Sequence, residues 1–410
     1  MLGRVSFEHV RRHWRGYAAL HVVVVGLIIA GAFALTLPLD RDPAARATRT
    51  RSTPPLPPGV HSLDEILEPI RATHRVPALA AAIVLDGRLI AIGAVGVRRG
   101  GDSVRVTTDD RFRIGSCTKS MTATLIGELV DEGRLRWDTT IAEVLPELAG
   151  RIRPEYCDVT VDQLLHHCSG LPDDRSNVML LWRYRALRGP LTRKRLRLAE
   201  IVLNLRPAAP RGLRNIYSNA GYCVLGAMAE RVTGRGWEEL MRGRLFEPLG
   251  MASAGFGSPS AGGSIEQPWG HAAFGRVFPR MRPECASPLP AVVGPAGDVC
   301  LSLADWAKYA SLHLDAERAR CRLLSCATFR HLHEATPGSL YACGWGRGTY
   351  EGLGPVLQHA GSDGRWYATI GLAPQRNLAI LTATNEGDPA GGAACGTAVA
   401  ALVLYRPEGK

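Results

Sequence analysis

A serine and a lysine stand three residues apart in the segment RIGSCTKS, residues 113–120, as Ser116 and Lys119. Apolar residues recur at helical spacing over 121–130, and one face of a helix holds residues that are three apart. A serine hydroxyl is a weak nucleophile unless a neighbouring base takes its proton, and the amine of a buried lysine can be that base. The start of a helix also turns backbone N–H groups toward developing negative charge. The pair therefore predicts a nucleophilic serine that is activated by a lysine.

Two other segments carry residue types that would complete such a site. Tyr217 and Asn219 lie in NIYSNAGY, where the phenol can pass a proton to a leaving group and the amide can bind both lysine and substrate. His359 and Gly361 stand directly before Ser362 and the apolar segment WYATIGL. Each motif alone is also compatible with an ordinary polar turn. Their occurrence together favours one site that is assembled from distant parts of the chain.

The elements before the serine are readable from their spacing. Residues 61–74 (HSLDEILEPIRATH) have the apolar spacing of a helix, with Ser62 as the candidate N-cap. Two apolar runs follow, joined by Asp86 and Gly87, which form the preferred two-residue hairpin turn. The pattern predicts antiparallel strands near 78–85 and 88–98.

The C-terminal part repeats this design in reverse order. Residues 366–385 predict two strands around a turn at 374–377, and an alanine-rich helix over about 389–405 closes the chain. The middle, roughly 116–340, is richer in helical periodicity. We therefore predict an α/β fold of the α+β type. One antiparallel sheet is built from both chain ends and flanked by terminal helices, with a large and mostly helical insertion.

Two more segments fit the same set of motifs. VTVDQLLHHCSGLPDD spans 159–174, and GPAGDVCLSLADWAKY spans 294–309. In this order, the five segments resemble the serine β-lactamase and penicillin-binding protein family, over roughly residues 60–405. The nearest branch pairs S-x-x-K with Y-x-N and holds class C-type β-lactamases, DD-peptidases and serine esterases. The resemblance implies a β-lactamase/transpeptidase-like fold.

The resemblance also implies roles for the motif residues. Ser116 would be the acylated nucleophile, and Lys119 and Tyr217 would share the general-base and general-acid work. The backbone N–H groups of Ser116 and Ser362 would form the oxyanion hole. The substrate would be bound by the remaining motif residues, Asn219, His359, Gly361 and Ser362.

Position 359 departs from the pattern of the family's β-lactamases, which usually have lysine there. Esterase-like and peptidase-like members more often carry histidine, so the resemblance favours a DD-peptidase-like or esterase-like hydrolase acting on an amide or ester. Because histidine titrates near neutrality, binding of a substrate carboxylate by His359 would weaken as pH rises. Arg365 is either a permanent substitute charge or a solvated strand residue, and Cys117 is expected to be a packed small residue.

Two alternatives remain open at this stage. One is a class C-like β-lactamase, and the other is a non-catalytic penicillin-binding sensor module. The complete set of Ser116, Lys119 and Tyr217 argues against the sensor. The G-x-S-x-G elbow of α/β-hydrolases is absent from the sequence, which excludes that second hydrolase fold.

The N-terminal residues predict a membrane connection. The chain has 49 basic and 38 acidic side chains, and only four of the basic ones are lysine. Eight arginines against three acidic residues within 1–55 supply +5 of the net charge of +11. Residues 17–39 are almost entirely apolar and predict a transmembrane anchor, with a secretory signal cleaved near Ala32–Phe33–Ala34 as the alternative.

This pattern divides the chain into a basic cytoplasmic leader (1–16), the apolar segment (17–39), a Pro/Arg-rich linker (40–59) and a serine hydrolase domain (60–410). We expect a single-pass protein of the cell membrane, with the catalytic domain on the outer (periplasmic or extracytoplasmic) side, or a cleaved and exported form. The expected partners are a small-molecule or peptide substrate and the membrane, without nucleic acid.

Metal and cofactor signals are weak in this sequence. Neither CxxC nor HExxH occurs, so we expect no cofactor and no metal, and His331 and His333 are better explained as surface histidines. Residues 183–197 carry seven basic side chains, which favour a solvated helical face over a membrane-surface contact. The ten cysteines permit disulfides but fix no pairing. They are Cys117, Cys157, Cys168, Cys223, Cys285, Cys300, Cys321, Cys326, Cys343 and Cys395.

Overall fold

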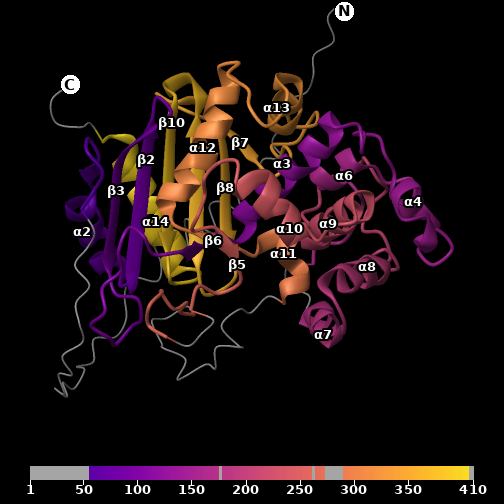
Figure 1. Cartoon of the computed structure of the whole chain (residues 1–410), viewed down its shortest axis with the longest axis horizontal. Helices are drawn as coiled ribbons and strands as arrows, with labels where there is room; N and C mark the ends of the chain where they lie inside the picture. Colours follow the sequence, from indigo (N-terminus) through magenta and orange to yellow (C-terminus); the bar gives the residue numbers. More distant parts are fainter. Residues whose placement is uncertain (1–54, 175–177, 261–263, 273–289, 406–410) are drawn as a thin grey trace, which may run out of the picture. The chain divides into compact units, whose positions relative to one another are not determined.

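The computed structural model describes residues 55–174, 178–260, 264–272 and 290–405 (Figure 1). The predicted leader, the apolar segment 17–39 and the linker up to residue 54 lie outside the described residues.

A seven-stranded sheet forms one side of the described structure (Figure 1). The strand order is β1-β3-β2-β10-β9-β8-β7, and every neighbouring pair is antiparallel except β1 with β3. Strands from the two chain ends meet where β10 pairs with β2 over seven residues each. The predicted fold class is therefore confirmed. The strands are β1 (His61–Ser62), β2 (Ala78–Leu85), β3 (Arg88–Gly96), β7 (Gly346–Tyr350), β8 (Gly354–Ser362), β9 (Tyr367–Ala373) and β10 (Leu378–Thr384).

Both predicted hairpins are present, with the turns that the sequence indicates. Asp86 and Gly87 have φ values of 53° and 73°, as a two-residue turn with both central residues in the left-handed region requires. Between β9 and β10 the chain forms a 3₁₀ turn, Pro374–Arg376, followed by Asn377 at a φ of 49°. The N-terminal helix differs from the prediction, because residues 61 and 62 form β1 and Leu63 occupies the N-cap position.

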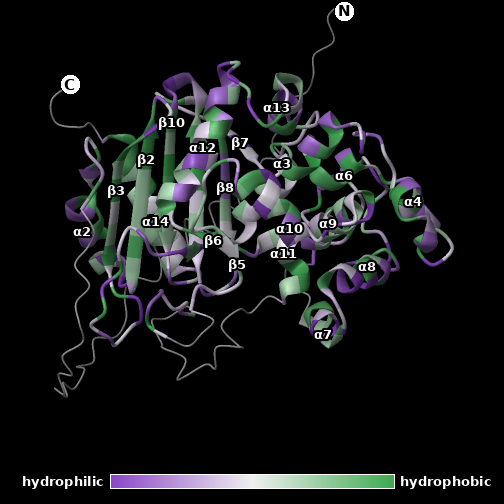
Figure 2. Cartoon of the chain, viewed as in Figure 1, coloured by the Kyte–Doolittle hydropathy of each residue, from purple (hydrophilic) through white to green (hydrophobic). Residues whose placement is uncertain are grey.

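Successive side chains of β2 point to opposite faces of the sheet and belong to two different apolar clusters. Leu79, Ala81 and Ile83 face a small cluster with α2 (Asp64–His74) and α14 (Ala390–Val403). The residues between them belong to a much larger cluster, which includes α12 (Leu303–Glu317) on the other face of the sheet. The central strands β2 and β10 are accordingly strongly apolar (Figure 2).

The predicted helical insertion lies beside this sheet (Figure 1). A small second sheet of order β4-β6-β5 joins the strand before Ser116 to two strands of the insertion. Its strands are β4 (Phe112–Arg113), β5 (Gly255–Phe256) and β6 (Val299–Leu301). The helices are α3 (Thr118–Asp131), α4 (Ile141–Val144), α5 (Pro154–Cys157), α6 (Val161–Leu165), α7 (Val178–Ala186), α8 (Leu191–Val202), α9 (Asn219–Thr233), α10 (Trp237–Met241), α11 (Gly294–Gly297) and α13 (Cys326–His333). Short 3₁₀ turns cover Gly115–Cys117, Pro146–Leu148 and Ala291–Val293, and Arg242–Phe246 forms a π-helical turn.

The prediction of a single-pass location in the cell membrane is not supported by the length and composition of the described helices. Among the residues that the structure describes, none of the helices is both long and apolar enough to cross a membrane. The longest, α9 and α12, have 15 residues each, which is about 22 Å of helix against the roughly 30 Å of a hydrocarbon core. A single-pass span is therefore not supported.

Candidate active site

Ser116 lies in the 3₁₀ turn Gly115–Cys117 that leads from β4 into α3. Gly115 has a φ of 49°, and a Cβ at this position would stand 2.7 Å from the backbone nitrogen of Ser362. A glycine is therefore required on both counts, since any side chain would be strained and would push β8 away. The turn leaves Ser116 half-buried at the start of α3.

Lys119 lies in the first turn of α3 and is fully buried. Its Nζ is 3.1 Å from Ser116 Oγ, 2.8 Å from Asn219 Oδ1 and 2.8 Å from the Ala296 carbonyl oxygen. These polar partners accept hydrogen bonds from the amine, which explains how the site holds a buried lysine. The structure thus brings together the serine, the lysine and the asparagine that the sequence singled out.

Tyr217 and Asn219 stand at the start of α9. The Tyr217 ring lies beside the lysine, with Lys119 Nζ 4.8 Å from the ring centroid. Asp174 caps this helix end, because its two carboxylate oxygens accept the backbone N–H groups of Asn219 at 2.8 Å and Ala220 at 2.9 Å. Burial raises the pKa of Asp174, while these hydrogen bonds and the charge of Lys119 oppose the increase.

The end of β8 forms the opposite wall of the site. A Cβ on Gly361 would stand 2.0 Å from the Ile114 carbonyl oxygen and 2.6 Å from the Ser116 nitrogen. Only a glycine lets the strand approach the turn so closely. The contact brings the backbone nitrogens of Ser116 and Ser362 to the same edge of the site, where two N–H groups can face one oxygen.

His359 lies two residues before Gly361 on β8 and is half-buried. Its Nε2 is 3.2 Å from the Tyr341 hydroxyl, and its ring centroid is 6.4 Å from that of Tyr217. Burial and the nearby charge of Lys119 lower the pKa of His359 to about 4. The expectation that this histidine titrates near neutrality is therefore wrong, and its ring is uncharged at neutral pH.

Arg113 is a site residue that sequence reasoning missed. It is fully buried, and its Nε is 2.7 Å from Asp363 Oδ2 while its Nη1 is 2.8 Å from Asp298 Oδ1. The two ion pairs tie the strand before Ser116 to the residue after Ser362 and to α11. Arg113 stands inside RIGSCTKS, but nothing local indicates that its partners lie 185 and 250 residues further along the chain.

Sequence reasoning also missed three further residues around the site, which are His167, Tyr341 and Asp174. His167 packs against Tyr217 at 4.3 Å and against Tyr341 at 4.7 Å between ring centroids. Asp174 closes the segment 159–174 that entered the resemblance, yet the sequence does not show that it caps a helix 45 residues later. Aromatic packing and remote capping are tertiary contacts, so local spacing carries no signal for them.

The other residues that the sequence singled out lie away from the Ser116–Lys119 contact or only pack beside it. Cys117 is fully buried, as expected, and burial raises the pKa of its thiol far above the ordinary value. Arg365 lies in the turn between β8 and β9, where its backbone N–H donates to Asp363. The basic segment 183–197 is not uniformly solvated, because Arg195 is fully buried and pairs with Glu230 and Glu238.

Comparison with known proteins agrees with this geometry. The sequence matches the Beta-lactamase family over residues 63–404. It is 31% identical to penicillin-binding protein 4 of Amycolatopsis lactamdurans over 334 residues, covering 79% of this chain and 84% of that protein. It is 25% identical to the D-alanyl-D-alanine-carboxypeptidase/endopeptidase AmpH of Escherichia coli K12 over 351 residues, covering 78% and 85%.

A solved structure shares the fold. The octameric penicillin-binding protein homologue from Pyrococcus abyssi superposes with a TM-score of 0.67 at 24% identity, covering 84% of this chain and 77% of that one. The protein is thus an enzyme of the serine hydrolase class. It belongs to the β-lactamase family.

Proposed function

We propose that residues 60–410 form a catalytic domain in which an amide or ester substrate acylates Ser116. Water then hydrolyses this acyl-enzyme and releases the acyl group. The observation that carries the proposal is the environment of Lys119, whose Nζ is 3.1 Å from Ser116 Oγ and also contacts Asn219 Oδ1 and the Ala296 carbonyl oxygen. The substrate is a small molecule or a peptide, so the activity is DD-peptidase-like or esterase-like. The reaction needs no cofactor.

Two further contacts of Lys119 favour proton transfer from the serine to the lysine. The amide oxygen of Asn219 and the carbonyl of Ala296 can only accept hydrogen bonds. A neutral amine would give both of its protons to these two oxygens and turn its lone pair toward the Ser116 hydroxyl. In that state Lys119 takes the serine proton as Oγ attacks the substrate carbonyl.

The remaining groups act on the tetrahedral intermediate. The backbone N–H groups of Ser116 and Ser362 stabilise the oxyanion, which the close approach of Gly361 supports. Tyr217, next to the lysine, delivers its phenol proton to the leaving group. During deacylation it regains a proton from the attacking water, and Lys119 returns its proton to Ser116 Oγ as the acyl–oxygen bond breaks. Asn219 binds the substrate amide in addition to holding Lys119.

The substrate preference follows from His359. A neutral histidine at neutral pH offers no positive charge for a substrate carboxylate, which favours esters without a carboxylate over the carboxylate-bearing β-lactams. The Escherichia coli relative is named as a D-alanyl-D-alanine carboxypeptidase and endopeptidase, which supports a peptide as the substrate.

Labelling tests the proposed nucleophile directly. A fluorophosphonate or a labelled penicillin should add one adduct at Ser116, identified by intact mass and peptide mapping. Lys119→Met should abolish the adduct, because the serine would lose its base, while the far-ultraviolet circular dichroism stays unchanged. An adduct at another residue, no adduct at all, or full reactivity of the variant would contradict the mechanism.

A substrate panel separates the alternatives. We expect p-nitrophenyl esters or a D-Ala-D-Ala peptide to be turned over faster than nitrocefin. Faster turnover of nitrocefin would instead identify a class C-like β-lactamase. Labelling at Ser116 without turnover of any of the three would favour the non-catalytic sensor.

A further inference from the structure

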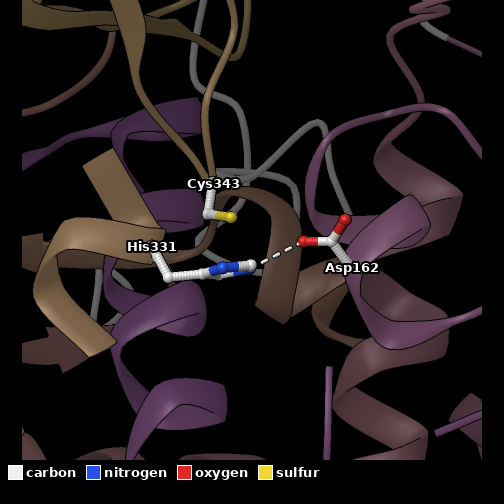
Figure 3. A group of neighbouring side chains, drawn as sticks. All are labelled: Asp162, His331 and Cys343. Carbon is white, nitrogen blue, oxygen red and sulfur yellow. Dashed lines mark hydrogen bonds and ion pairs between the residues drawn. The ribbon is translucent and has the colours of Figure 1, made fainter. Parts of the chain in front are cut away.

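A cluster of three metal-ligating side chains lies outside the proposed active site. Asp162, His331 and Cys343 come from α6, α13 and the loop before β7, and Figure 3 shows them converging. One ligand atom from each residue lies within 4.8 Å of the corresponding atoms of the other two. The three positions are too far apart in sequence to form a spacing motif, so sequence patterns alone do not indicate a metal partner for His331.

The donor set suits a borderline-soft divalent cation. A thiolate, an imidazole nitrogen and a carboxylate oxygen are the ligands of tetrahedral zinc sites, at about 2.0–2.3 Å from the ion. These lengths place donor atoms roughly 3.3–3.7 Å apart. His331 Nε2 and Asp162 Oδ1, now 2.7 Å apart in a hydrogen bond, would separate slightly while the thiol moves closer.

Access and support also favour a metal. Cys343 is fully buried, whereas the side chains of Asp162 and His331 are 31% and 32% exposed. A cation can therefore arrive from solvent and meet the thiol at the back of the site. The thiol gives up its proton to solvent as the sulfur–metal bond forms, and water takes the fourth position.

The neighbouring side chains orient the three ligands. Trp137 stacks on the His331 ring at 4.0 Å, and His166 Nδ1 is 3.0 Å from the Asp162 carboxylate. The Nε2 of His166 is 3.0 Å from the Glu334 carbonyl oxygen and 3.6 Å from Cys343 Sγ, so this ring lies beside both the carboxylate and the thiol and orients them. Hydrogen-bonded ligands of this kind are typical of metal sites.

His333, two residues after His331, lies in different surroundings and does not belong to the cluster. It was also expected to be a surface histidine, but it is buried and bonds Glu317 and His313. The two histidines of HLH thus face different surroundings. Only His331 joins the cluster.

We propose that Asp162, His331 and Cys343 bind one zinc ion, which braces the wall of the active site. The loop that carries Cys343 continues into Gly344, where a Cβ would stand 2.5 Å from the Ser120 nitrogen of α3. Tyr341, two residues before Cys343, contacts His359. The metal therefore joins α6 and α13 to a loop that touches both the lysine-bearing helix and β8.

Metal binding by the purified full chain tests the proposal. Cobalt(II), used as a spectroscopic probe, should bind one ion per chain with a thiolate-to-metal charge-transfer band, and zinc should displace it. Elemental analysis after dialysis against zinc should also find one ion per chain. His331→Gln should weaken binding at least about tenfold, and Cys343→Ala should abolish the charge-transfer band.

Matched controls keep the outcome interpretable. Cys157→Ala removes a free, half-buried thiol, and Asp158→Asn removes an exposed carboxylate, and both should bind cobalt like the unmodified chain. His331→Gln alters a partly exposed side chain, so its result stands even if Cys343→Ala fails to fold. No zinc retained, no charge-transfer band, or unchanged affinity in His331→Gln would overturn the proposal. None of these readouts depends on hydrolysis.

Discussion

The charges of Lys119 and His359 are coupled across the width of the active site. Burial and the lysine charge both disfavour a proton on the histidine, and its pKa falls to about 4. His359 is therefore neutral at physiological pH. In the proposed site, a neutral histidine supplies no charge with which to hold a substrate carboxylate.

The lowered pKa of His359 predicts a pH-dependent contribution to stability. The unfolded value is near 6.5, so between pH 6.5 and 4 the unfolded chain binds more protons than the folded one. Stability from the neutral histidine is complete above pH 6.5 and is lost as pH falls toward 4. His359→Gln removes this dependence. Between about pH 7 and pH 4.5 the variant should lose about 1–2 kcal/mol less unfolding free energy than the unmodified chain, as measured by urea unfolding.

The control for this measurement is His61→Gln, which changes an exposed histidine at the start of the sheet. That variant should keep the acid sensitivity of the unmodified chain. Equal losses in His359→Gln and in the unmodified chain would show that His359 is not held neutral by its surroundings.

At the scale of elements, the site depends on one contact between the 3₁₀ turn at Ser116 and the end of β8. Glycines on both sides, Gly115 and Gly361, allow backbone to touch backbone. Arg113 holds the contact from behind through its ion pairs with Asp298 and Asp363. A buried arginine with two carboxylate partners satisfies its charge and fixes two distant segments together.

Gly361→Ala should open this contact. The new methyl group would overlap the Ile114 carbonyl oxygen, so β8 must move and the Ser362 N–H must leave the oxyanion position. Loss of one such donor costs about 100-fold or more in rate. We expect this decrease in the rate of acylation by a fluorophosphonate, with the secondary structure retained.

Gly371→Ala is the matched control, because a Cβ at Gly371 on the neighbouring strand β9 meets nothing within 4 Å. It should react at the rate of the unmodified chain. If both variants were equally slow, general damage to the sheet would explain the loss, and the proposed contact would not.

The elements that local spacing specifies were predictable, and those that tertiary contacts specify were not. The turn at Asp86 and Gly87 needs only two residues that tolerate positive φ, so both its place and its strands followed from the sequence. Residues 61 and 62 read as the start of a helix, yet pairing with β3 draws them into the sheet. Asp174 and Arg113 act through partners far along the chain, and Asp162, His331 and Cys343 meet only in the folded structure.

At the scale of the whole molecule, N-terminal and C-terminal strands pair with each other in one open sheet. Strand β10 pairs with β2 and with β9, and α14 packs beside α2 over the face away from α12. The insertion that carries Lys119 and Tyr217 therefore lies between two terminal parts that stabilise each other. Weakening the last helix should lower the stability of the entire fold rather than of that helix alone.

Two leucines near the end of α14 test this cooperativity. Leu402 is 1% exposed and packs in the small apolar cluster, whereas Leu404 is 75% exposed. Leu402→Ala should lower the free energy of unfolding by about 2–4 kcal/mol, and Leu404→Ala should stay within about 0.5 kcal/mol of the unmodified chain. In urea, loss of circular dichroism and loss of Ser116 labelling should coincide in both variants. If labelling persisted after α14 had melted in Leu402→Ala, the terminal layer would be an independent unit, and the site would not need the pairing of N-terminal and C-terminal strands in one sheet.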